Sequence, residues 1–196
     1  MDRVTLILAS ASPRRKELIR QLGLPVEFAV NNVDECAQGN LPPEQVVERL
    51  AERKARAAYE AIGPRENAVV VAGDTVVVYG GEILGKPKDE DDAFRMLCLL
   101  QGKTHAVYSG ISCIACADGK VLTGHSRTLV TMKPLSDAQI RRYIRTGEPM
   151  DKAGAYAIQG LGSAIVEKIE GDYFTVVGLP LAMLADMLAQ LDVRVL

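Results

Sequence analysis

The chain has 196 residues, of which 48% are hydrophobic and 24% are charged, and its formal net charge is −2. A chain of this length and apolar content can bury a large core, which fits one domain or two lobes that share one sheet, and residues 1–196 are expected to form a single domain. The small net charge excludes a general basic field that would hold nucleic acid by its backbone. No apolar run is long enough for a transmembrane helix, and Val4–Ala9 is too short for a secretion signal, so a cytoplasmic protein is expected.

Apolar runs alternate with capping and breaking residues along the first half of the chain, which predicts strands alternating with helices. Strands are expected over residues 4–8, 26–30, 68–72 and 75–79, with a hairpin turn at Gly80-Gly81. Helices are expected over residues 12–22, 42–62 and 89–100.

The second half of the chain adds two long strands, 104–115 and 120–132, joined by a turn at Asp118-Gly119. A capping box formed by Ser136 and Gln139 begins a helix that extends to about residue 146. A polar loop with several glycines, 147–162, is followed by a strand at 163–169 and a last helix at 179–191. This mixture of helices, hairpins and long strands predicts an α/β protein with a mixed, elongated sheet and flanking helices.

The four cysteines, Cys36, Cys98, Cys113 and Cys116, do not indicate a disulfide framework in a chain of this size. Cys113 and Cys116 form a C-x-x-C motif, but they lie in an expected strand, where residues three apart point to opposite faces. The sequence has neither a second such motif nor enough histidines to complete a zinc site. Buried structural thiols are therefore favoured over a metal or redox site.

The segment from Ser10 to Arg15 places basic residues where a helix begins. Ser12 is expected to cap the helix, so Arg14 and Arg15 fall in a first turn that has no acidic residue. The partial positive charge at a helix N-terminus makes this arrangement unfavourable unless an anion binds there. Free backbone N–H groups, the hydroxyls of Ser10 and Ser12 and two guanidinium groups suit a phosphate. From the residues alone, a phosphate site and a solvated basic turn are equally supported.

The long helix expected over residues 42–62 carries a lysine on its apolar side. Lys54 lies near the centre of the apolar stripe, whereas most other charged residues of this helix lie on the opposite face. An unpaired ammonium turned inward costs several kcal/mol. Either the side chain extends out to solvent or it meets an anion, and the second interpretation makes Lys54 a candidate substrate-binding residue.

Gly73-Asp74-Thr75 follows an apolar strand, which places Asp74 at the carboxyl end of a buried strand, where open α/β sheets bind ligands. Glu35 is a second candidate acid. Paired carboxylates together with phosphates suit Mg²⁺ or Mn²⁺ rather than zinc. Asp74 is therefore a candidate catalytic residue and, with Glu35, a candidate metal ligand, and a simple turn cap is the alternative for Asp74.

Two further segments carry residues that suit a nucleotide. A Gly-Lys-Pro segment offers Lys86, and the loop that follows Asp151 offers Lys152 and Gln159 near glycines, which allow a backbone to approach a ligand closely. Such loops are common, and Asp151 and Lys152 can simply pair elsewhere, so the signal is weak on its own. His105 is expected to be structural.

Taken together, these segments resemble the Maf family, also called septum-formation-inhibitor proteins, over nearly the whole chain. Several short motifs in the family's order make the resemblance specific. They are Leu8-Ala9-Ser10-x-Ser12-Pro13-Arg14-Arg15, Glu35, Lys54-Ala55, Gly73-Asp74-Thr75, Gly85-Lys86-Pro87, Asp151-Lys152-Ala153-Gly154-Ala155-Tyr156, Gly171-Asp172-Tyr173 and Val177-Gly178-Leu179-Pro180. Two departures, Ser109 and Phe174-Thr175, bear on fine specificity more than on the reaction.

The resemblance implies a fold similar to that of the inosine-triphosphate pyrophosphatases, with two lobes around a cleft. It implies cleavage between the α- and β-phosphates of a nucleoside triphosphate with a divalent metal, Mg²⁺ or Mn²⁺, and with Asp74 as the general base. It also implies that residues matching Arg14, Thr75 and Gln159 separate a branch acting on dTTP and UTP from a branch acting on 7-methyl-GTP. This chain carries the pyrimidine set.

The expected function is therefore a nucleoside triphosphate pyrophosphatase that converts dTTP and UTP to the monophosphate and pyrophosphate. The triphosphate is expected to be held by Arg14, Arg15, Lys54 and Lys86, while Asp74 orients or deprotonates the attacking water. Two alternatives stay open: a nucleotide-responsive binding protein in cell division with little turnover, and a pyrophosphatase for modified purine triphosphates such as 7-methyl-GTP. The expected partner is a small-molecule nucleotide, with neither nucleic acid nor membrane, and the sequence leaves a homodimer open.

Overall fold

The computed structural model describes residues 4–29, 33 and 41–196, and the chain divides into two compact units. Unit 1 comprises Met1–Asp74, Ser109–Ser126 and Gly178–Leu196, and unit 2 comprises Thr75–Tyr108 and Arg127–Val177. Because the chain passes from one unit to the other several times, each unit is assembled from segments distant in sequence. The prediction that residues 1–196 form a single domain stays a prediction.

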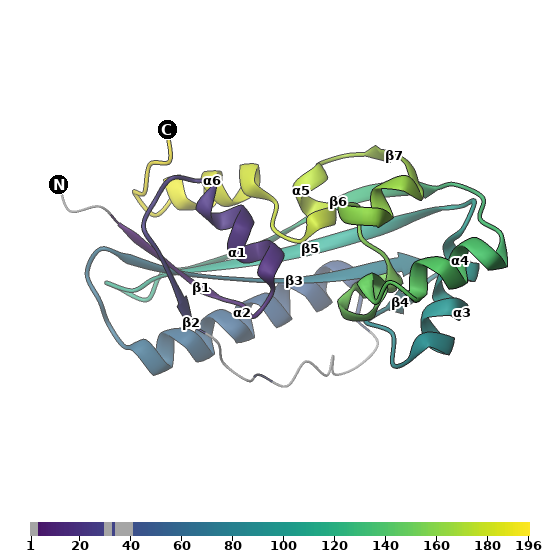
Figure 1. The fold of residues 1–196 in the computed structure, drawn as a ribbon. Helices are drawn as coiled ribbons and strands as arrows, with labels where there is room; N and C mark the ends of the chain where they lie inside the picture. The colour runs from purple at the N-terminus through teal and green to yellow at the C-terminus, as the bar shows by residue number, and fades with distance from the viewer. Residues whose placement is uncertain (1–3, 30–32, 34–40) are drawn as a thin grey trace. The chain divides into compact units, whose positions relative to one another are not determined.

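The strands described in the structure belong to one mixed sheet. They are β1 (Thr5–Ala9), β2 (Val26–Ala29), β3 (Ala68–Tyr79), β4 (Glu82–Leu84), β5 (Thr104–Ala115), β6 (Val121–Met132) and β7 (Val166–Glu170). Their order is β2-β1-β3-β5-β6-β7, with β4 paired to β3 (Figure 1). β1 runs parallel to β2 and β3, whereas β3–β4 and β6–β7 are antiparallel. The predicted α/β class with a mixed sheet and flanking helices is confirmed.

With one exception, the short helix α5 (Tyr173–Val177), the helices in the described part of the chain lie close to the predicted positions. They are α1 (Pro13–Arg20), α2 (Pro43–Ile62), α3 (Glu90–Leu100), α4 (Asp137–Ile144), α5 (Tyr173–Val177) and α6 (Leu181–Ala189). The predicted capping box is present, because Ser136 and Gln139 exchange side-chain-to-backbone hydrogen bonds at the start of α4. Among the described residues, no helix has both the length and the apolar character needed to cross a membrane.

In unit 1, α2 packs closely on the sheet, and α1 and α6 lie on the opposite face (Figure 1). Ala55 of α2 is fully buried in the same core cluster as Ala72 of β3. Gly110 of β5 permits the closest approach, since a Cβ there would lie 2.4 Å from the carbonyl oxygen of Val47. A larger residue at Gly110 would push α2 off the sheet. The helix that carries Lys54 is thereby held against β3 and β5.

The core of unit 2 includes residues of α3, α4 and the sheet. Leu97 of α3 and Ile140 of α4 are buried in one cluster with Met132 of β6. Tyr156 belongs to the same cluster and comes from the segment between α4 and β7. A buried aromatic side chain contributes a large apolar area, so this segment is anchored in the core although its sequence is polar.

Strand β3 is longer than the sequence predicts. The sequence divides the segment into two strands with Asp74 at the end of the first, but β3 continues unbroken from Ala68 to Tyr79. The prediction that Asp74 lies at the carboxyl end of a strand is therefore wrong. A Cβ on Gly73 would lie 3.1 Å from the carbonyl oxygen of Gly110, so this glycine allows a close contact within the sheet instead of forming a turn.

The chain after residue 160 also differs from the prediction. The strand predicted from Ser163 begins at Val166, because Gly160–Ala164 forms a 3-10 turn. The sequence analysis did not predict α5, whose β-branched residues favour strands. Oδ2 of Asp172 accepts hydrogen bonds from the backbone N and the hydroxyl of Thr175, at 2.6 and 2.8 Å. This capping contact starts the helix despite its composition.

The described cysteines form no disulfide, and two of them are buried. Cys98, Cys113 and Cys116 are free thiols, and Cys36 lies outside the described residues. Burial raises the pKa of Cys113 to about 12 and also raises the pKa of Cys116. Since the thiolate is the nucleophile and the metal ligand, these thiols suit the structural role that the sequence predicts.

Candidate active site

Helix α1 begins with the basic residues that the sequence singles out. The hydroxyl of Ser12 caps the helix by accepting a hydrogen bond from the backbone N of Arg15 at 3.5 Å. Ser10 is buried, and its hydroxyl accepts a hydrogen bond from the backbone N of Ser12 at 3.2 Å. Arg14 and Arg15 therefore lie in the first turn of α1, which contains no acidic residue. The predicted basic helix start is confirmed, and its use as a phosphate site stays a proposal.

The guanidinium of Arg15 is hydrogen-bonded to a backbone carbonyl and to a hydroxyl. Its Nε donates a hydrogen bond to the carbonyl oxygen of Gly178 at 2.7 Å, and its Nη1 donates to the hydroxyl of Ser10 at 3.4 Å. A Cβ on Gly73 would lie 3.4 Å from Nε of Arg15, so the missing side chain leaves room for the guanidinium. These three neighbours hold the guanidinium beside Gly73 of β3.

Lys54 and Asp74 form an ion pair between α2 and β3. Nζ of Lys54 lies 2.8 Å from Oδ1 of Asp74, and the two side chains are only 14% and 13% exposed. Of the two interpretations of the inward lysine, the structure favours the second, and the chain itself supplies the anion. A pair this shielded holds both groups in place, because removing either one leaves a poorly solvated charge.

The contacts of Arg15 and Lys54 lie at adjacent residues of β3. The pairing of β1 with β3 ends before Gly73 and Asp74 are reached, and Ser10 directly follows β1. Because successive strand residues point to opposite faces, Arg15 approaches at Gly73 and Lys54 approaches at Asp74 from the other face. We refer to Ser10, Arg15, Lys54 and Asp74, whose contacts lie at or beside Gly73 and Asp74 on the two faces of β3, as the unit 1 cluster.

The unit 1 cluster has the chemical groups that an anionic substrate requires. A guanidinium and an ammonium bind phosphate oxygens with charge-assisted hydrogen bonds. A carboxylate can orient a water molecule and accept its proton. The N-cap residue Ser12 and the first-turn residue Arg14 adjoin the cluster through α1.

Asp74 is the described half of the predicted metal site, because Glu35 lies outside the described residues. Within the residues that the structure describes, no group of three or more His, Cys, Asp or Glu side chains converges on a metal position. One carboxylate still fits Mg²⁺, which is commonly bound through one or two carboxylates and completed by water and substrate phosphates. The donor chemistry of Asp74 therefore fits the predicted divalent cation.

The remaining predicted site residues belong to unit 2. Thr75 continues β3 and is partly buried, whereas Lys86 follows β4 and is exposed. Gln159 is partly buried and immediately precedes the 3-10 turn Gly160–Ala164, and its side chain makes no capping hydrogen bond to that turn.

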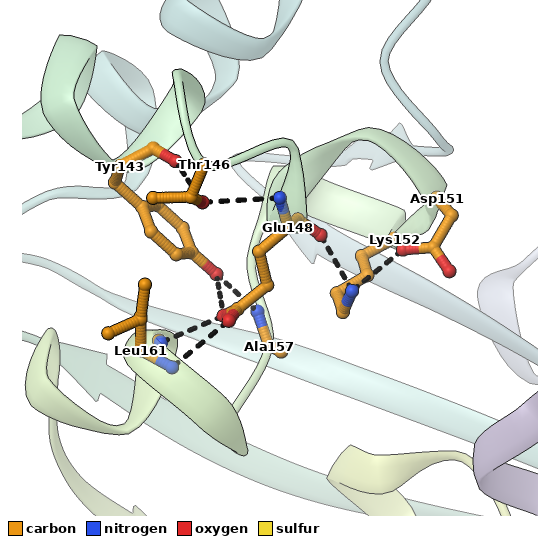
Figure 2. Close-up of polar contacts among 8 residues, drawn as sticks. Tyr143, Thr146, Glu148, Asp151, Lys152, Ala157 and Leu161 are labelled. Atoms are coloured by element: carbon orange, nitrogen blue, oxygen red, sulfur yellow. Dashed lines mark hydrogen bonds and ion pairs between the residues drawn. The ribbon is translucent and has the colours of Figure 1, made fainter.

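Lys152 is bonded within its own loop. Its Nζ donates hydrogen bonds to the carbonyl oxygen of Glu148 at 2.6 Å and to Oδ1 of Asp151 at 2.7 Å (Figure 2). The Lys152 side chain is 12% exposed and that of Asp151 is 62% exposed. The loop therefore supplies the partners of its own lysine, so the pairing that the sequence left open takes place between adjacent residues.

Two polar residues that organise this loop, Tyr143 and Glu148, are not predicted from the sequence. The hydroxyl of Tyr143 donates a hydrogen bond to Oε1 of Glu148 at 2.7 Å (Figure 2). Neither residue stands out in the sequence, since Glu148 resembles an ordinary turn residue and Tyr143 lies on the apolar side of α4. The available signal is the pair of glycines at 160 and 162, which indicates a segment packed closely against another group.

His105 makes a structural contact, as the sequence predicts. It is 3% exposed, and its Nε2 lies 2.7 Å from the hydroxyl of Tyr156. Burial lowers the pKa of His105 to about 4, so the ring is neutral at physiological pH. Its Nδ1 has no hydrogen-bond partner within the described part of the chain.

Known proteins resemble this chain over nearly its full length. The sequence model of a family described as Maf-like protein matches residues 5–191. The dTTP/UTP pyrophosphatase of Pelotomaculum thermopropionicum is 49% identical, and the match covers 97% of this chain and 98% of that protein. The dTTP/UTP pyrophosphatase of Caldanaerobacter subterraneus subsp. tengcongensis is 50% identical, and the match covers 96% of this chain and 89% of that protein.

Solved structures are less similar. The Ham1 protein of Staphylococcus aureus is 14% identical with a TM-score of 0.48, and the match covers 83% of this chain and 79% of that chain. A likeness of this size carries no argument about the site. The family assignment rests on the sequence relatives.

Proposed function

This chain belongs to the Maf family, and we propose that it hydrolyses dTTP and UTP to the corresponding monophosphate and pyrophosphate. The observation that carries the proposal is that relatives about half identical to the chain, over nearly its whole length, bear the name dTTP/UTP pyrophosphatase. The unit 1 cluster supports the same reaction on chemical grounds, since it combines phosphate-binding cations with a carboxylate suited to act on water.

The triphosphate binds at the start of α1. Arg14 and Arg15 offer guanidinium donors there, and the hydroxyls of Ser10 and Ser12 lie beside them. The first turn lacks an acid of its own, so a phosphate improves the electrostatics of the helix terminus. Lys54 adds positive charge beside Asp74. Lys86 and Lys152 are proposed as further substrate-binding residues on the strength of the family resemblance alone.

Asp74 is the proposed general base. Its carboxylate orients the attacking water and accepts a proton as the bond between the α- and β-phosphates breaks. Lys54 holds Oδ1 of Asp74 at 2.8 Å and so limits the rotation of the carboxylate. Orientation and charge stabilisation supply most of the catalysis in this class of reaction, so no covalent intermediate is needed.

Asp74 and Glu35 are the residues proposed to hold Mg²⁺ or Mn²⁺. A divalent ion, when bound, neutralises charge on the phosphate oxygens. Activity is therefore expected to be lost on addition of a chelator and restored by excess Mg²⁺.

Gln159 is proposed to recognise the base. Its amide offers both a donor and an acceptor, which complement an imide edge of uracil or thymine, where an N–H lies between two carbonyls. Cytosine lacks this imide, because a ring nitrogen acceptor and an amino group replace the N–H and one carbonyl. Thr75 and Arg14 are proposed to add to the same preference.

The test is a profile of kcat/KM across dTTP, UTP, CTP, ATP, GTP, inosine triphosphate and 7-methyl-GTP in the presence of Mg²⁺. The proposal predicts that dTTP and UTP lead, that CTP is weaker and that the purine triphosphates are poor. A preference for 7-methyl-GTP or inosine triphosphate would refute the pyrimidine assignment, and the absence of turnover with every nucleotide would refute the enzyme.

A further inference from the structure

The loop around Gln159 is fixed on both sides by one pair of side chains from the same unit. Before Gln159, the hydroxyl of Tyr143 accepts a hydrogen bond from the backbone N of Ala157 at 3.1 Å. After Gln159, the carboxylate of Glu148 accepts from the backbone N of Leu161 at 3.0 Å and from that of the next residue at 2.9 Å. Tyr143 and Glu148 are bonded to each other at 2.7 Å, so the two anchors form one network (Figure 2).

Two glycines allow this network to lie against the backbone. Gly160 has a φ of +63°, and a Cβ there would lie 2.6 Å from Oε2 of Glu148. A Cβ on Gly162 would lie 2.0 Å from the carbonyl oxygen of Ala157 and 2.7 Å from the hydroxyl of Tyr143. Approaches this close cannot accommodate a side chain. Glycine at 160 therefore leaves room for the carboxylate of Glu148, and glycine at 162 leaves room for the carbonyl of Ala157 and the hydroxyl of Tyr143.

The ionisation state of Glu148 suits its role as the acceptor of three hydrogen bonds. Burial alone raises the pKa of Glu148, but hydrogen bonds from Tyr143, Gly162 and Leu161 and the nearby charge of Lys152 lower it overall from 4.5. The group is thus an ionised, acceptor-only carboxylate at neutral pH, which is the form that three donors require.

The same segment is partly exposed. Gln159 makes no capping contact with the turn that follows it, and Leu161 is 60% exposed. The network therefore fixes the backbone near Gln159 while leaving its amide outside the turn's own hydrogen bonds. A fixed backbone reduces the conformational freedom that a recognition side chain must lose on binding.

We propose that Glu148, acting with Tyr143, is a positioning residue that sets the orientation of Gln159 and thereby the choice of base. This inference rests on the proposed function, because it needs Gln159 to recognise the uracil or thymine edge. Glu148 itself touches neither substrate nor metal in this proposal. A misplaced amide should weaken the pairing with UTP much more than it weakens use of CTP, because cytosine presents the reverse pattern of donor and acceptor and pairs only with an amide turned by 180°.

The test compares kcat and KM for UTP and CTP in the wild type, Glu148→Gln and Tyr143→Phe. The Glu148→Gln variant keeps the size of the side chain but places an amide where one backbone N–H needs an acceptor. We expect the ratio of kcat/KM for UTP over CTP to fall about tenfold, mostly through KM for UTP. Glu167→Gln, an exposed change in the same unit, is the matched control and should leave the ratio unchanged.

A second measurement separates positioning from folding. In a Gln159→Ala background, Glu148→Gln should cause no further fall in the ratio, because the residue through which it acts is gone. Equal losses for UTP and CTP in Glu148→Gln would show a purely structural role and overturn the inference, as would a full effect that persists in the Gln159→Ala background. If Glu148→Gln does not fold, Tyr143→Phe carries the same test by removing only the hydroxyl.

Failure of the inference can be told from failure of the proposed function. A wild type that prefers UTP, together with an unchanged ratio in both loop variants, overturns the role of Glu148 and Tyr143 alone. A wild type without UTP turnover overturns the proposed function, and the inference with it, before any variant is made.

Discussion

The start of α1 and the loop over residues 147–162 both combine small residues with basic side chains, but the structure uses them differently. Arg15, at the start of α1, is oriented by a carbonyl and a hydroxyl, and its helix turn contains no acid. Lys152, in the loop, is bonded to the backbone of Glu148 and to the carboxylate of Asp151. A helix start without an acid of its own suits an anionic ligand. The lysine of the loop, in contrast, already supports the loop's own structure.

The largest expected effect is on the carboxylate of the unit 1 cluster. Asp74→Asn should lower kcat by roughly 10² to 10⁴ because an amide cannot accept the proton of water. The fold should persist, since the asparagine oxygen can still accept a hydrogen bond from Lys54. Steady-state kinetics and circular dichroism check both points, with Glu60→Gln on the exposed side of α2 as the control. A folded Asp74→Asn protein with wild-type kcat would show that the base lies elsewhere.

Replacing Arg15 at the start of α1 and Lys152 in the loop tests whether these two cations have different roles. Arg15→Ala should lower kcat/KM for UTP by about 100-fold, because charge-assisted hydrogen bonds to phosphate are lost. Lys152→Ala should lower kcat/KM less and the melting temperature more, since this ammonium supports the loop. Parallel kinetics and thermal melts of the two variants give the answer, and the reverse order of effects would contradict the comparison.

The Lys54–Asp74 ion pair should contribute to the stability of the protein in the absence of substrate. Lys54→Met leaves the carboxylate of Asp74 shielded and without this partner, so the free energy of unfolding should fall by about 1–3 kcal/mol. The double variant Lys54→Met, Asp74→Asn should recover part of the loss, because the unpaired charge is gone. Urea unfolding of the three proteins tests this, and a double variant less stable than Lys54→Met would argue against the pair.

A smaller effect concerns the pH dependence of stability. It arises at His105, which contacts Tyr156, the residue that anchors the loop in the core. The pKa of His105 is lowered from 6.5 to about 4, so protons bind the unfolded chain more readily than the folded one. This contribution to stability is complete above the unfolded pKa and is lost as pH falls toward the folded value. Between about pH 7 and about pH 5, His105 should account for a loss of roughly 2 kcal/mol.

The matched variant for this prediction is His105→Phe. Its ring fills a similar space and does not titrate, so its free energy of unfolding should depend less on pH over the same range. The cost of leaving the Tyr156 hydroxyl without this partner is the same at each pH and does not obscure the slope. Identical slopes for the wild type and His105→Phe would contradict the assigned pKa.

Much of the fold follows from local patterns in the sequence. The limits of α2 and α3, the long strands β5 and β6, and the capping box at Ser136 are fixed by periodicity, turn residues and caps, and the structure confirms them. The continuity of strand β3 could not be predicted from such local patterns. Gly73 has the appearance of a strand breaker, and only the distant contacts with Gly110 and Arg15 explain it.

The same limit applies to the candidate site, where contacts between distant segments could not be predicted from the sequence. The helical pattern shows that Lys54 turns inward, but its partner Asp74 comes from another element, and local sequence does not encode that pairing. Glu148 was missed for the same reason, since its hydrogen-bond donors at Leu161 and Gly162 become its neighbours only in the folded loop.

The most direct test of the central claim is the identity of the products formed from UTP. Phosphorus NMR of a reaction with Mg²⁺ should show UMP and pyrophosphate appearing together at equal rates, with Asp74→Asn slower by at least about 100-fold. The appearance of UDP and orthophosphate would mean that the γ-phosphate is cleaved and would contradict the account.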